Sequence, residues 1–270
     1  MSGLKNLNKE WRDWIKVSLL KGVPANKVAS ELSKRGWTDA AYELMDKSSK
    51  NLNIPYISLT ENKVTLSDKE LSISYACHKP YIVVLDDFLS TEECTALIKM
   101  SQDKFKTSRV VNDDDGTRIE SKSRISQSVS HSKSSHKLVK TIESRIAELL
   151  NWPANHGEGL LVLKYENGGE YKPHYDYFNP NKAGSSQVMQ ESGQRVGTFL
   201  MFLSEVEAGG STRFPKLNFE VRPKTGRAIF FSNVGLDGEI DEMTLHAGMP
   251  VTKGIKYLST VWLREKPYSS

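Results

Sequence analysis

A mainly β protein of the α+β class is predicted from the 270-residue sequence, with a sandwich or barrel of short strands, supporting helices and a small N-terminal helical module. Two observations favour this class. Apolar residues recur at helical spacing up to about residue 47, and the period changes to two from about residue 55. After about residue 158 the chain consists of short apolar stretches separated by glycine and proline, which is typical of many short strands.

The composition is that of an ordinary globular protein. Hydrophobic residues make up 38% of the chain and charged residues 26%, with no apolar run long enough to cross a bilayer. The N-terminus lacks the apolar segment of a secretion signal, and Cys77 and Cys94 are too few for a disulfide framework. We therefore expect a cytoplasmic protein with no membrane partner.

The net charge of +4 comes entirely from the N-terminal residues. Residues 1–50 carry ten Lys/Arg against six Asp/Glu, and the remaining chain carries 27 residues of each sign. A surplus of this size on a helical unit is more typical of a solvated face than of a nucleic-acid site. We therefore expect no nucleic-acid partner, although the module is mildly basic.

Three short helices are predicted in the N-terminal module. Residues 8–21 show helical spacing of their apolar side chains, and Gly22 ends this helix. A second helix is expected to end at Gly36, and Thr38 is predicted to cap a third that carries Tyr42, Leu44 and Met45. The polar stretch DKSSKNLN follows and is predicted to be a linker.

A β-hairpin and a buried strand are predicted next. Apolar and polar residues alternate on both sides of the turn at residues 67–70, as expected for a hairpin. The following stretch, PYIVVLDDF, has the continuous apolar character of a buried strand.

Two supporting helices are predicted after this strand. Ser90 and Glu93 have the spacing of a capping box, which places the first helix directly after Ser90. The second helix is expected over about residues 136–150, where the apolar residues share one face, and Trp152-Pro153 ends it.

The remainder is predicted to contain eight short strands and no helix, in the stretches GLLVLKY, EYKPHYDYF, GTFLMFL, STRF, NFEVRP, RAIFFS, MTLHAG and KYLSTVWL. The longest irregular segment runs from Asn179 to Gln194 and is rich in serine, glycine and glutamine. We expect it to form a mobile lid.

Three residues in this region have the side chains of a metal site. His174 and Asp176 would lie on the same face of one strand, because alternate residues of a strand point the same way. A His-x-Asp triplet alone is weak evidence, but His246 in a second predicted strand supplies a third ligand. Two histidines and one carboxylate form the triad that is associated with non-haem iron, although a hydrolytic zinc site could use the same residues.

Lys256 favours iron over zinc. It shares one face of the last predicted strand with Leu258, Thr260 and Trp262, so its ammonium group is expected to point into the barrel. A buried lysine requires a partner, and a dicarboxylate cosubstrate would provide it. The alternative is that Lys256 begins the strand at an exposed edge.

The chain resembles the catalytic domain of the prolyl 4-hydroxylases, within the 2-oxoglutarate- and Fe(II)-dependent dioxygenases, over about residues 79–266. The matching stretches, in the family's order, are KPYIVVLDDFLSTEEC, SRIS, IESRIAELL, LVLKYENGGEYKPHYDYF, GQRVGTFLMFLSEVEAGGSTRFP and LHAGMPVTKGIKYLSTVWLRE. The resemblance implies a double-stranded β-helix (jelly-roll) fold. Together with the patterns upstream, it divides the chain into a helical module (1–50), a linker with a β-hairpin (51–78) and a dioxygenase domain (79–270).

The resemblance assigns the central residues of the site. His174, Asp176 and His246 correspond to the family's iron ligands, and Lys256 corresponds to the residue that pairs with the distal carboxylate of 2-oxoglutarate.

Further positions match residues around the cosubstrate and the peptide. Tyr165 and Thr212 match positions near the distal carboxylate, where hydroxyl groups add hydrogen bonds. The peptide side of the cavity is matched by Tyr171, Arg195 and Trp262, and the family's R-x-S segment near the substrate by Arg124 and Ser126. For Tyr171, Arg195, Arg124 and Ser126, an ordinary packing or surface role remains open.

The implied function is hydroxylation of peptidyl proline to 4-hydroxyproline, with Fe(II), 2-oxoglutarate and O2 as cofactor and cosubstrates, succinate and CO2 as coproducts, and ascorbate as reductant. Tyr257 stands where many relatives carry tryptophan, and no tandem-helical peptide-binding domain precedes the matched region. The resemblance is therefore to the free-standing enzymes of microbes, viruses and algae. Two alternatives remain open: the same chemistry on a free amino acid, another protein residue or a nucleobase, and a non-catalytic metal-binding scaffold.

Overall fold

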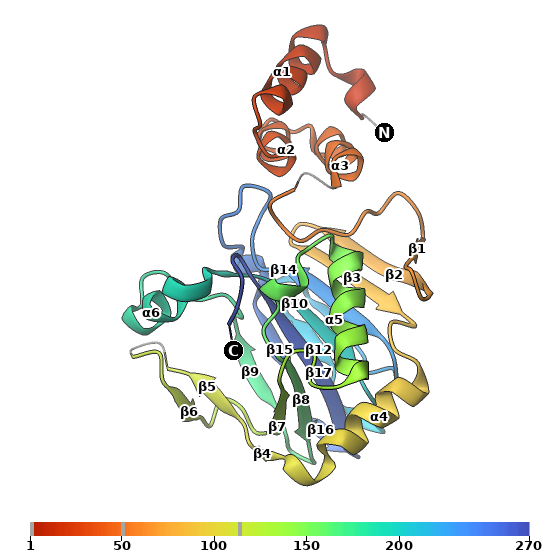
Figure 1. Ribbon diagram of the computed structural model, residues 1–270, viewed down its shortest axis with the longest axis vertical. Coiled ribbons are helices and arrows are strands. Elements are labelled where there is room, and N and C mark those ends of the chain that lie inside the picture. The colour runs from red at the N-terminus through yellow and green to blue at the C-terminus, as the bar shows by residue number, and fades with distance from the viewer. Residues whose placement is uncertain (1–2, 50–51, 113–114, 270) are drawn as a thin grey trace.

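The computed structural model describes residues 3–49, 52–112 and 115–269. Its helical module lies at one end of the molecule, and two β-sheets with their supporting helices form the remainder (Figure 1). None of the described helices combines the length and the apolar character that are needed to cross a membrane.

The three predicted N-terminal helices are present. A 3₁₀ turn at Leu4–Asn6 (η1) precedes three α-helices, α1 (Lys9–Leu20), α2 (Ala25–Lys34) and α3 (Thr38–Lys47). The predicted cap of α3 is wrong by one residue, because Trp37 is the N-cap and Thr38 is already helical. The backbone carbonyl of Trp37 accepts the first helical hydrogen bond, from Ala41 N at 2.9 Å. Residues 50–51 of the predicted linker lie outside the described residues.

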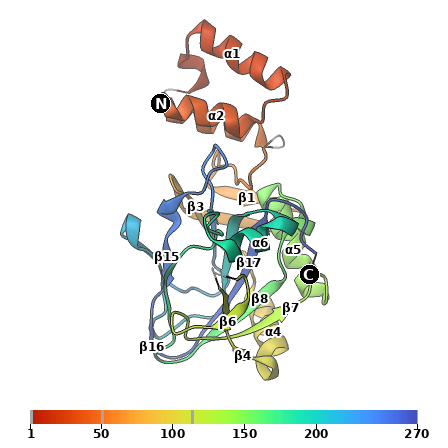
Figure 2. The same cartoon turned by 90° about the vertical axis from the view of Figure 1, so that its left-hand side faces the viewer.

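The helical module packs on the end of the sheets through one continuous core. Val28, Leu32 and Met45 belong to the same apolar cluster as Tyr81 and other residues of the large sheet. The Asn26 amide also donates to the carbonyl of Leu236, at 2.9 Å. Figure 2 shows the module above the ends of the strands, well away from the opposite end of the sheets.

The large sheet has nine strands in the order β1-β2-β3-β14-β10-β17-β8-β7-β4. Its strands are β1 (Lys63–Thr65), β2 (Glu70–His78), β3 (Tyr81–Asp86), β4 (Lys106–Thr107), β7 (Gln127–His131), β8 (Leu160–Tyr165), β10 (Arg195–Phe202), β14 (Ala228–Ser232) and β17 (Lys256–Arg264). All eight residues of the central strand β10 are buried, including Arg195 and Thr198 among its otherwise apolar residues. The predicted hairpin is present as strands β1 and β2, which form one edge of this sheet.

One face of the large sheet is covered by the two predicted supporting helices, α4 (Thr91–Ser101) and α5 (Lys137–Leu150) (Figure 1). The capping box that Ser90 and Glu93 predict is present at the start of α4. Short 3₁₀ turns follow each helix, η3 at Gln102–Lys104 and η4 at Ala154–His156.

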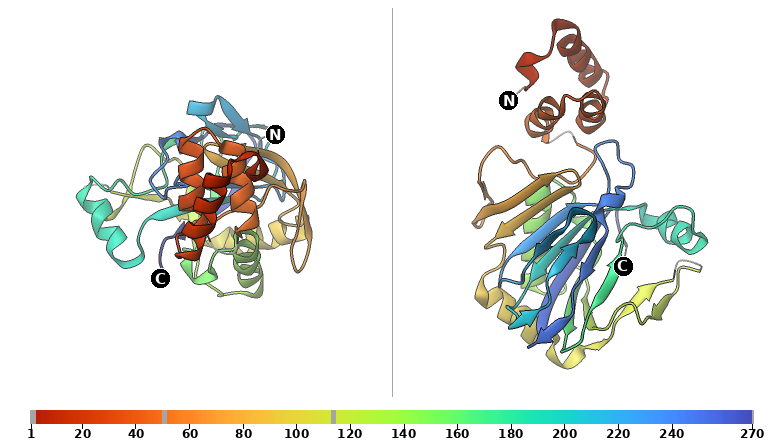
Figure 3. Two further views of the ribbon diagram at one scale, coloured as in Figure 1. Left: turned by 90° about the horizontal axis from the view of Figure 1, so that it is seen from above. Right: turned by 180° about the vertical axis from the view of Figure 1, so that it is seen from behind.

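A four-stranded sheet lies against the other face, with the order β13-β12-β15-β9. Its strands are β9 (Tyr171–His174), β12 (Thr212–Phe214), β13 (Phe219–Val221) and β15 (His246–Gly248), with 3₁₀ turns η5 (Pro215–Leu217) and η6 (Glu242–Thr244) beside them. Phe214 and Val221 of this sheet pack with Phe202, Phe231 and Leu258 of the large sheet in a second apolar cluster. The strands that make up the two sheets are visible from behind in Figure 3.

Several elements differ from the sequence-based predictions, and among them strands β4 and β7 of the large sheet were not predicted. The segment expected to be irregular contains a helix, α6 (Ala183–Ser192), whose small and polar residues lack an apolar stripe. Two short strand pairs were not predicted. They are β11 (Ala208–Gly209) with β16 (Val251–Lys253), and the hairpin β5 (Arg109–Val111) with β6 (Arg118–Glu120).

The interior of β10 should dominate the stability of the fold. Phe199 is fully buried, and its ring centroid lies 4.6 Å from that of Phe88. We expect Phe199→Ala to lower the free energy of unfolding by about 3–5 kcal/mol, because it leaves a cavity between the sheet and its covering helices. Urea denaturation measures this change. Val17→Ala, at a side chain that is 46% exposed, is the control and should change the value by less than about 0.5 kcal/mol.

Candidate metal and cosubstrate site

Two neighbouring strands bring the three metal-ligand side chains together. His174 at the end of β9 lies directly opposite His246 at the start of β15. Asp176 was predicted on the same strand as His174, but β9 ends at His174 and Asp176 lies in the bend that follows. One ligand atom from each of the three residues lies within 4.8 Å of the other two. The geometry therefore permits a single ion to contact all three.

Hydrogen bonds orient both imidazoles toward this point. Nδ1 of His174 lies 2.8 Å from the carbonyl oxygen of Lys172, and Nδ1 of His246 lies 3.0 Å from that of Thr244. A carbonyl oxygen only accepts, so in each ring the proton is on Nδ1 and the Nε2 lone pair is free for a metal. The two Nε2 atoms lie 3.6 Å and 3.5 Å from the carboxylate oxygens of Asp176.

Asp176 is oriented by a chain of neutral side chains. The Thr198 hydroxyl on β10 donates to Asp176 Oδ2 at 2.9 Å, and the Asn233 amide donates to the Thr198 oxygen at 3.2 Å. All three groups are buried. This contact fixes the carboxylate so that Oδ1 faces His174 Nε2 and Oδ2 faces His246 Nε2.

The electrostatics of the three residues suit a cation. Burial, together with the charge of His246, lowers the pKa of His174 to about 3, so the imidazole is neutral at ordinary pH. Burial alone would raise the pKa of Asp176, but His246, His174 and Arg195 hold it below the usual value. The site thus presents a neutral histidine and a carboxylate, which are the protonation states that bind a metal.

Lys256 is the first residue of β17 and lies opposite Tyr165 of β8. Its side chain is 1% exposed, and within the described part of the chain it has no hydrogen bond and no ion pair. Its nearest ring contacts are Tyr165 and Phe202, with centroids 5.3 Å and 5.5 Å from Nζ. Burial lowers the pKa of Lys256 to about 7. A buried amine in this state has a strong demand for an anionic partner.

The same cavity contains the three ligand residues and Lys256. Tyr165, Thr212, Thr260 and Trp262 also line it. The Thr260 hydroxyl oxygen and the Trp262 indole nitrogen are buried without a hydrogen-bond partner among the described residues. An indole N–H can only donate, as can an ammonium group, and neither the Trp262 nitrogen nor Lys256 Nζ has an acceptor within hydrogen-bond distance among the described residues. A small dicarboxylate that also contacts the metal fits this set of donors.

A larger groove of about 930 Å³ opens beside this cavity, and Arg124, Tyr171, Asp176 and Trp262 line both. The Tyr171 ring stacks on His174 with a centroid distance of 3.5 Å, and the Arg124 guanidinium lies 4.8 Å from the Tyr171 centroid.

Two other predicted substrate residues occupy different surroundings. Arg195 lies in the groove, with its guanidinium 4.0 Å from the centroid of Trp262. The Ser126 hydroxyl instead donates to Ser108 at 2.8 Å, and Ser126 is not among the residues that line the groove. The roles of these residues toward substrate stay predictions.

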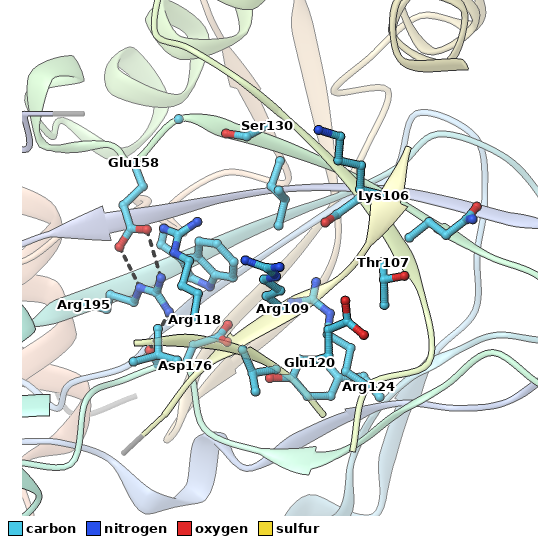
Figure 4. A pocket seen from close by; sticks show the side chains of 18 of the residues that line it. Lys106, Thr107, Arg109, Arg118, Glu120, Arg124, Ser130, Glu158, Asp176 and Arg195 are labelled. Carbon is cyan, nitrogen blue, oxygen red and sulfur yellow. Dashed lines mark hydrogen bonds and ion pairs between the residues drawn. The ribbon is translucent and has the colours of Figure 1, made fainter. Parts of the chain in front are cut away.

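Glu158 was not predicted as a functional residue. Its carboxylate accepts two hydrogen bonds from Arg195, at 2.7 Å and 2.9 Å (Figure 4). It also accepts one from Arg264 at 3.1 Å. Arg264 also donates to the carbonyl of Val188 in α6, at 2.9 Å. The buried Glu158 thus connects the groove wall with α6. A single glutamate before a strand has no sequence pattern that would reveal this contact.

Comparison with known proteins agrees with this geometry. The model of the 2OG-Fe(II) oxygenase superfamily matches residues 160–264. Probable prolyl 4-hydroxylase 3 of Arabidopsis thaliana is 37% identical over 209 residues, which cover 70% of this chain and 71% of that protein. Probable prolyl 4-hydroxylase 10 of the same plant is 35% identical and covers 75% of each. The chain belongs to the prolyl 4-hydroxylase family.

A solved structure of a prolyl hydroxylase has the same fold. The viral collagen prolyl hydroxylase of Paramecium Bursaria Chlorella virus-1, in complex with 2OG, superimposes with a TM-score of 0.54 and 28% identity. The match covers 68% of this chain and 96% of the viral chain. The predicted double-stranded β-helix with supporting helices is therefore confirmed.

Removal of a metal ligand should abolish metal binding. We expect Asp176→Ala to weaken the affinity for Mn(II) by more than about a hundredfold, because the only carboxylate of the ligand set is lost. Calorimetric titration measures the affinity. Thr198→Val, which removes only the hydrogen bond to Asp176, is the matched control and should cost about tenfold. Unchanged Mn(II) affinity in the Asp176 variant would contradict the assignment.

The affinity for 2-oxoglutarate should decrease as the pH rises. Because the pKa of Lys256 is lowered to about 7, the free amine is neutral above that pH and must take up a proton to bind a carboxylate. The dissociation constant should therefore rise by up to about tenfold per pH unit above pH 7. Calorimetry on the Mn(II)-loaded protein between about pH 6 and pH 9 measures it.

Lys256→Arg separates this effect from other titrations. A guanidinium stays protonated over the whole range, so the variant should show a flatter pH dependence even if its affinity is lower. A wild-type affinity that is constant across the range would exclude a neutral Lys256 in the free protein.

Proposed function

We propose that this protein is an Fe(II)- and 2-oxoglutarate-dependent dioxygenase that hydroxylates proline in a peptide to 4-hydroxyproline. One observation carries the proposal: a buried lysine, without an ion pair among the described residues, shares a cavity with two histidines and an aspartate whose ligand atoms converge. A metal triad alone would also suit hydrolysis. The adjacent cation makes a dicarboxylate cosubstrate the better explanation. Membership of the prolyl 4-hydroxylase family supports proline as the target.

The residues divide into three groups by role. His174, Asp176 and His246 would hold the iron, and Lys256 would pair with the distal carboxylate of 2-oxoglutarate. Tyr165 and Thr212 line the cavity close to Lys256 and would add hydrogen bonds to the same carboxylate. When bound, iron and 2-oxoglutarate activate O2 so that one oxygen atom enters a substrate C–H bond and the other enters succinate, with release of CO2.

The remaining task of the protein is to position the target C–H bond and to exclude water. Trp262 and Tyr171 provide flat walls beside the metal ligands. Arg195 is fixed between Glu158 and the Trp262 ring, so this part of the groove is rigid. A proline ring is compact and apolar and lacks an N–H in a peptide, which suits a site with aromatic walls.

The alternatives differ in substrate or in chemistry. A groove of about 930 Å³ that opens directly on the cavity favours a peptide over a free amino acid. Another protein residue or a nucleobase would use the same chemistry. A metal-binding scaffold without catalysis would not convert 2-oxoglutarate to succinate. We further propose that residues 79–270 form the dioxygenase domain, with residues 1–50 as a helical module. The cytoplasmic location and the use of ascorbate stay predictions.

Oxygen transfer to proline is measured directly by mass spectrometry. Proline-containing peptides incubated with the enzyme, Fe(II), 2-oxoglutarate and ascorbate should gain the mass of one oxygen on proline, with one succinate formed per hydroxylation. His246→Ala should give no product, because a metal ligand is missing. Succinate formation without peptide oxidation would point to another substrate, and the absence of both would favour the scaffold.

A further inference from the structure

Beyond the family chemistry, the groove has an unbalanced charge. Five cationic residues and three anionic residues line it. The cations are Lys106, Arg109, Arg118, Arg124 and Arg195, and the anions are Glu120, Glu158 and Asp176. Figure 4 shows most of these side chains around the same open space. Beyond residue 50 the chain carries equal numbers of both signs, so this surplus is a local concentration of charge.

Two of the three anions are already compensated. Glu158 is bonded to Arg195 and Arg264, at 2.7 Å and 3.1 Å. Asp176 belongs to the metal triad. Glu120 is the remaining carboxylate, which leaves four cations against one anion along the groove.

Two of these cations stand on the β5-β6 hairpin. The strand register places Arg109 opposite Glu120 and Val111 opposite Arg118, and opposite residues share one face of a hairpin. That face lines the groove. Ile119, which lies between Arg118 and Glu120 on the opposite face, does not line it and is 42% exposed. Within the described ranges, neither Arg109 nor Arg118 has an ion pair with a carboxylate. The hairpin therefore presents to an entering peptide two guanidinium groups that have no ion pair with any described carboxylate.

A third cation lies deeper, beside the metal ligands. Arg124 is 7% exposed, and its Nε has no hydrogen-bond partner in the part of the chain that the structure describes. Lys106 on β4 is exposed at the rim. Strand β7, which pairs with β4, contributes Gln127, Ser128 and Ser130 to the groove, and these neutral residues can hydrogen-bond a peptide backbone. Cations at two depths, with neutral polar groups beside them, suit an extended chain with acidic side chains.

We propose that this groove selects an acidic peptide, in which aspartate or glutamate flanks the target proline and pairs with Arg109, Arg118 and Lys106. The inference rests on the proposed function and adds the substrate class. Arginine binds a carboxylate through two parallel hydrogen bonds, so the preference should exceed simple attraction to negative charge.

Three peptides of equal length test the preference, with a central proline flanked by glutamate, glutamine or lysine. Their affinities are measured by fluorescence anisotropy on the enzyme loaded with Mn(II) and 2-oxoglutarate, which needs no oxygen transfer. The glutamate peptide should bind at least about tenfold more tightly than the glutamine peptide, and the difference should shrink at high salt. Equal affinities, or a preference for the lysine peptide, would overturn the proposal.

The double variant Arg109→Glu, Arg118→Glu should reverse the order. It should lose about tenfold or more for the glutamate peptide and gain affinity for the lysine peptide, and this gain shows that the variant is folded. Lys99→Glu and Lys140→Glu, on the exposed faces of α4 and α5, carry the same charge changes away from the groove and should leave all three affinities unchanged. Loss of affinity for all three peptides alike in the double variant would contradict the inference.

Two further outcomes keep the claims separate. Tight, charge-dependent binding without hydroxylation would leave this inference standing and refute the proposed function. Hydroxylation of all three peptides at equal efficiency would support the function and refute the inference. A single-stranded DNA of matched charge is tested in the same way. If it binds more tightly than the glutamate peptide, and if the double variant no longer binds it, the groove would be assigned to nucleic acid instead.

Discussion

The burial of the Lys256 ammonium group beside the proposed metal ligands is the constraint on which the site depends. A pKa lowered from 10.5 to about 7 corresponds to a cost on the order of 5 kcal/mol for keeping the amine charged. A protein retains such a group only when a partner recovers that free energy. None of the described residues forms a hydrogen bond or an ion pair with Lys256, which points to a ligand as the partner. The proposed metal triad lies at the other side of the cavity. The ligand should therefore contact Lys256 at one end and the metal at the other.

The fold provides this arrangement through the pairing of its strands. Lys256 comes from the large sheet and the two histidines from the small sheet, so the cavity lies between the sheets. The register of β15 against β9 sets the two histidines opposite each other, and the bend after β9 brings Asp176 back toward them. Thr198 on β10 then joins the Asp176 carboxylate to the large sheet. Small shifts between the two sheets would therefore change both the metal and the cosubstrate contacts.

Prediction from the sequence succeeded where a periodic pattern or a motif was present. The period-two stretches identified most strands of both sheets, and the capping box located the start of α4. The motif spacing also led to His174, His246 and Lys256 as a group, whose roles are untested. Asp176 was placed on a strand because the alternation rule does not detect where pairing stops, and β9 pairs only as far as His174.

Other elements had no signal that the sequence could provide. Helix α6 is built from small and polar residues without an apolar face, so its helical structure depends on tertiary contacts such as the bond from Arg264 to Val188. The β5-β6 hairpin is three residues long on each side and mostly exposed, which leaves little alternation to recognise. Glu158 is defined only by its partners, Arg195 and Arg264, which are distant in the sequence.

The most direct test of the account is a crystal structure with Mn(II) and 2-oxoglutarate bound. The account predicts a single Mn(II) held by Nε2 of His174, Nε2 of His246 and the Asp176 carboxylate, and a salt bridge between Lys256 Nζ and the distal carboxylate of 2-oxoglutarate. A metal that binds without His246, or a diacid whose distal carboxylate lies away from Lys256, would contradict it.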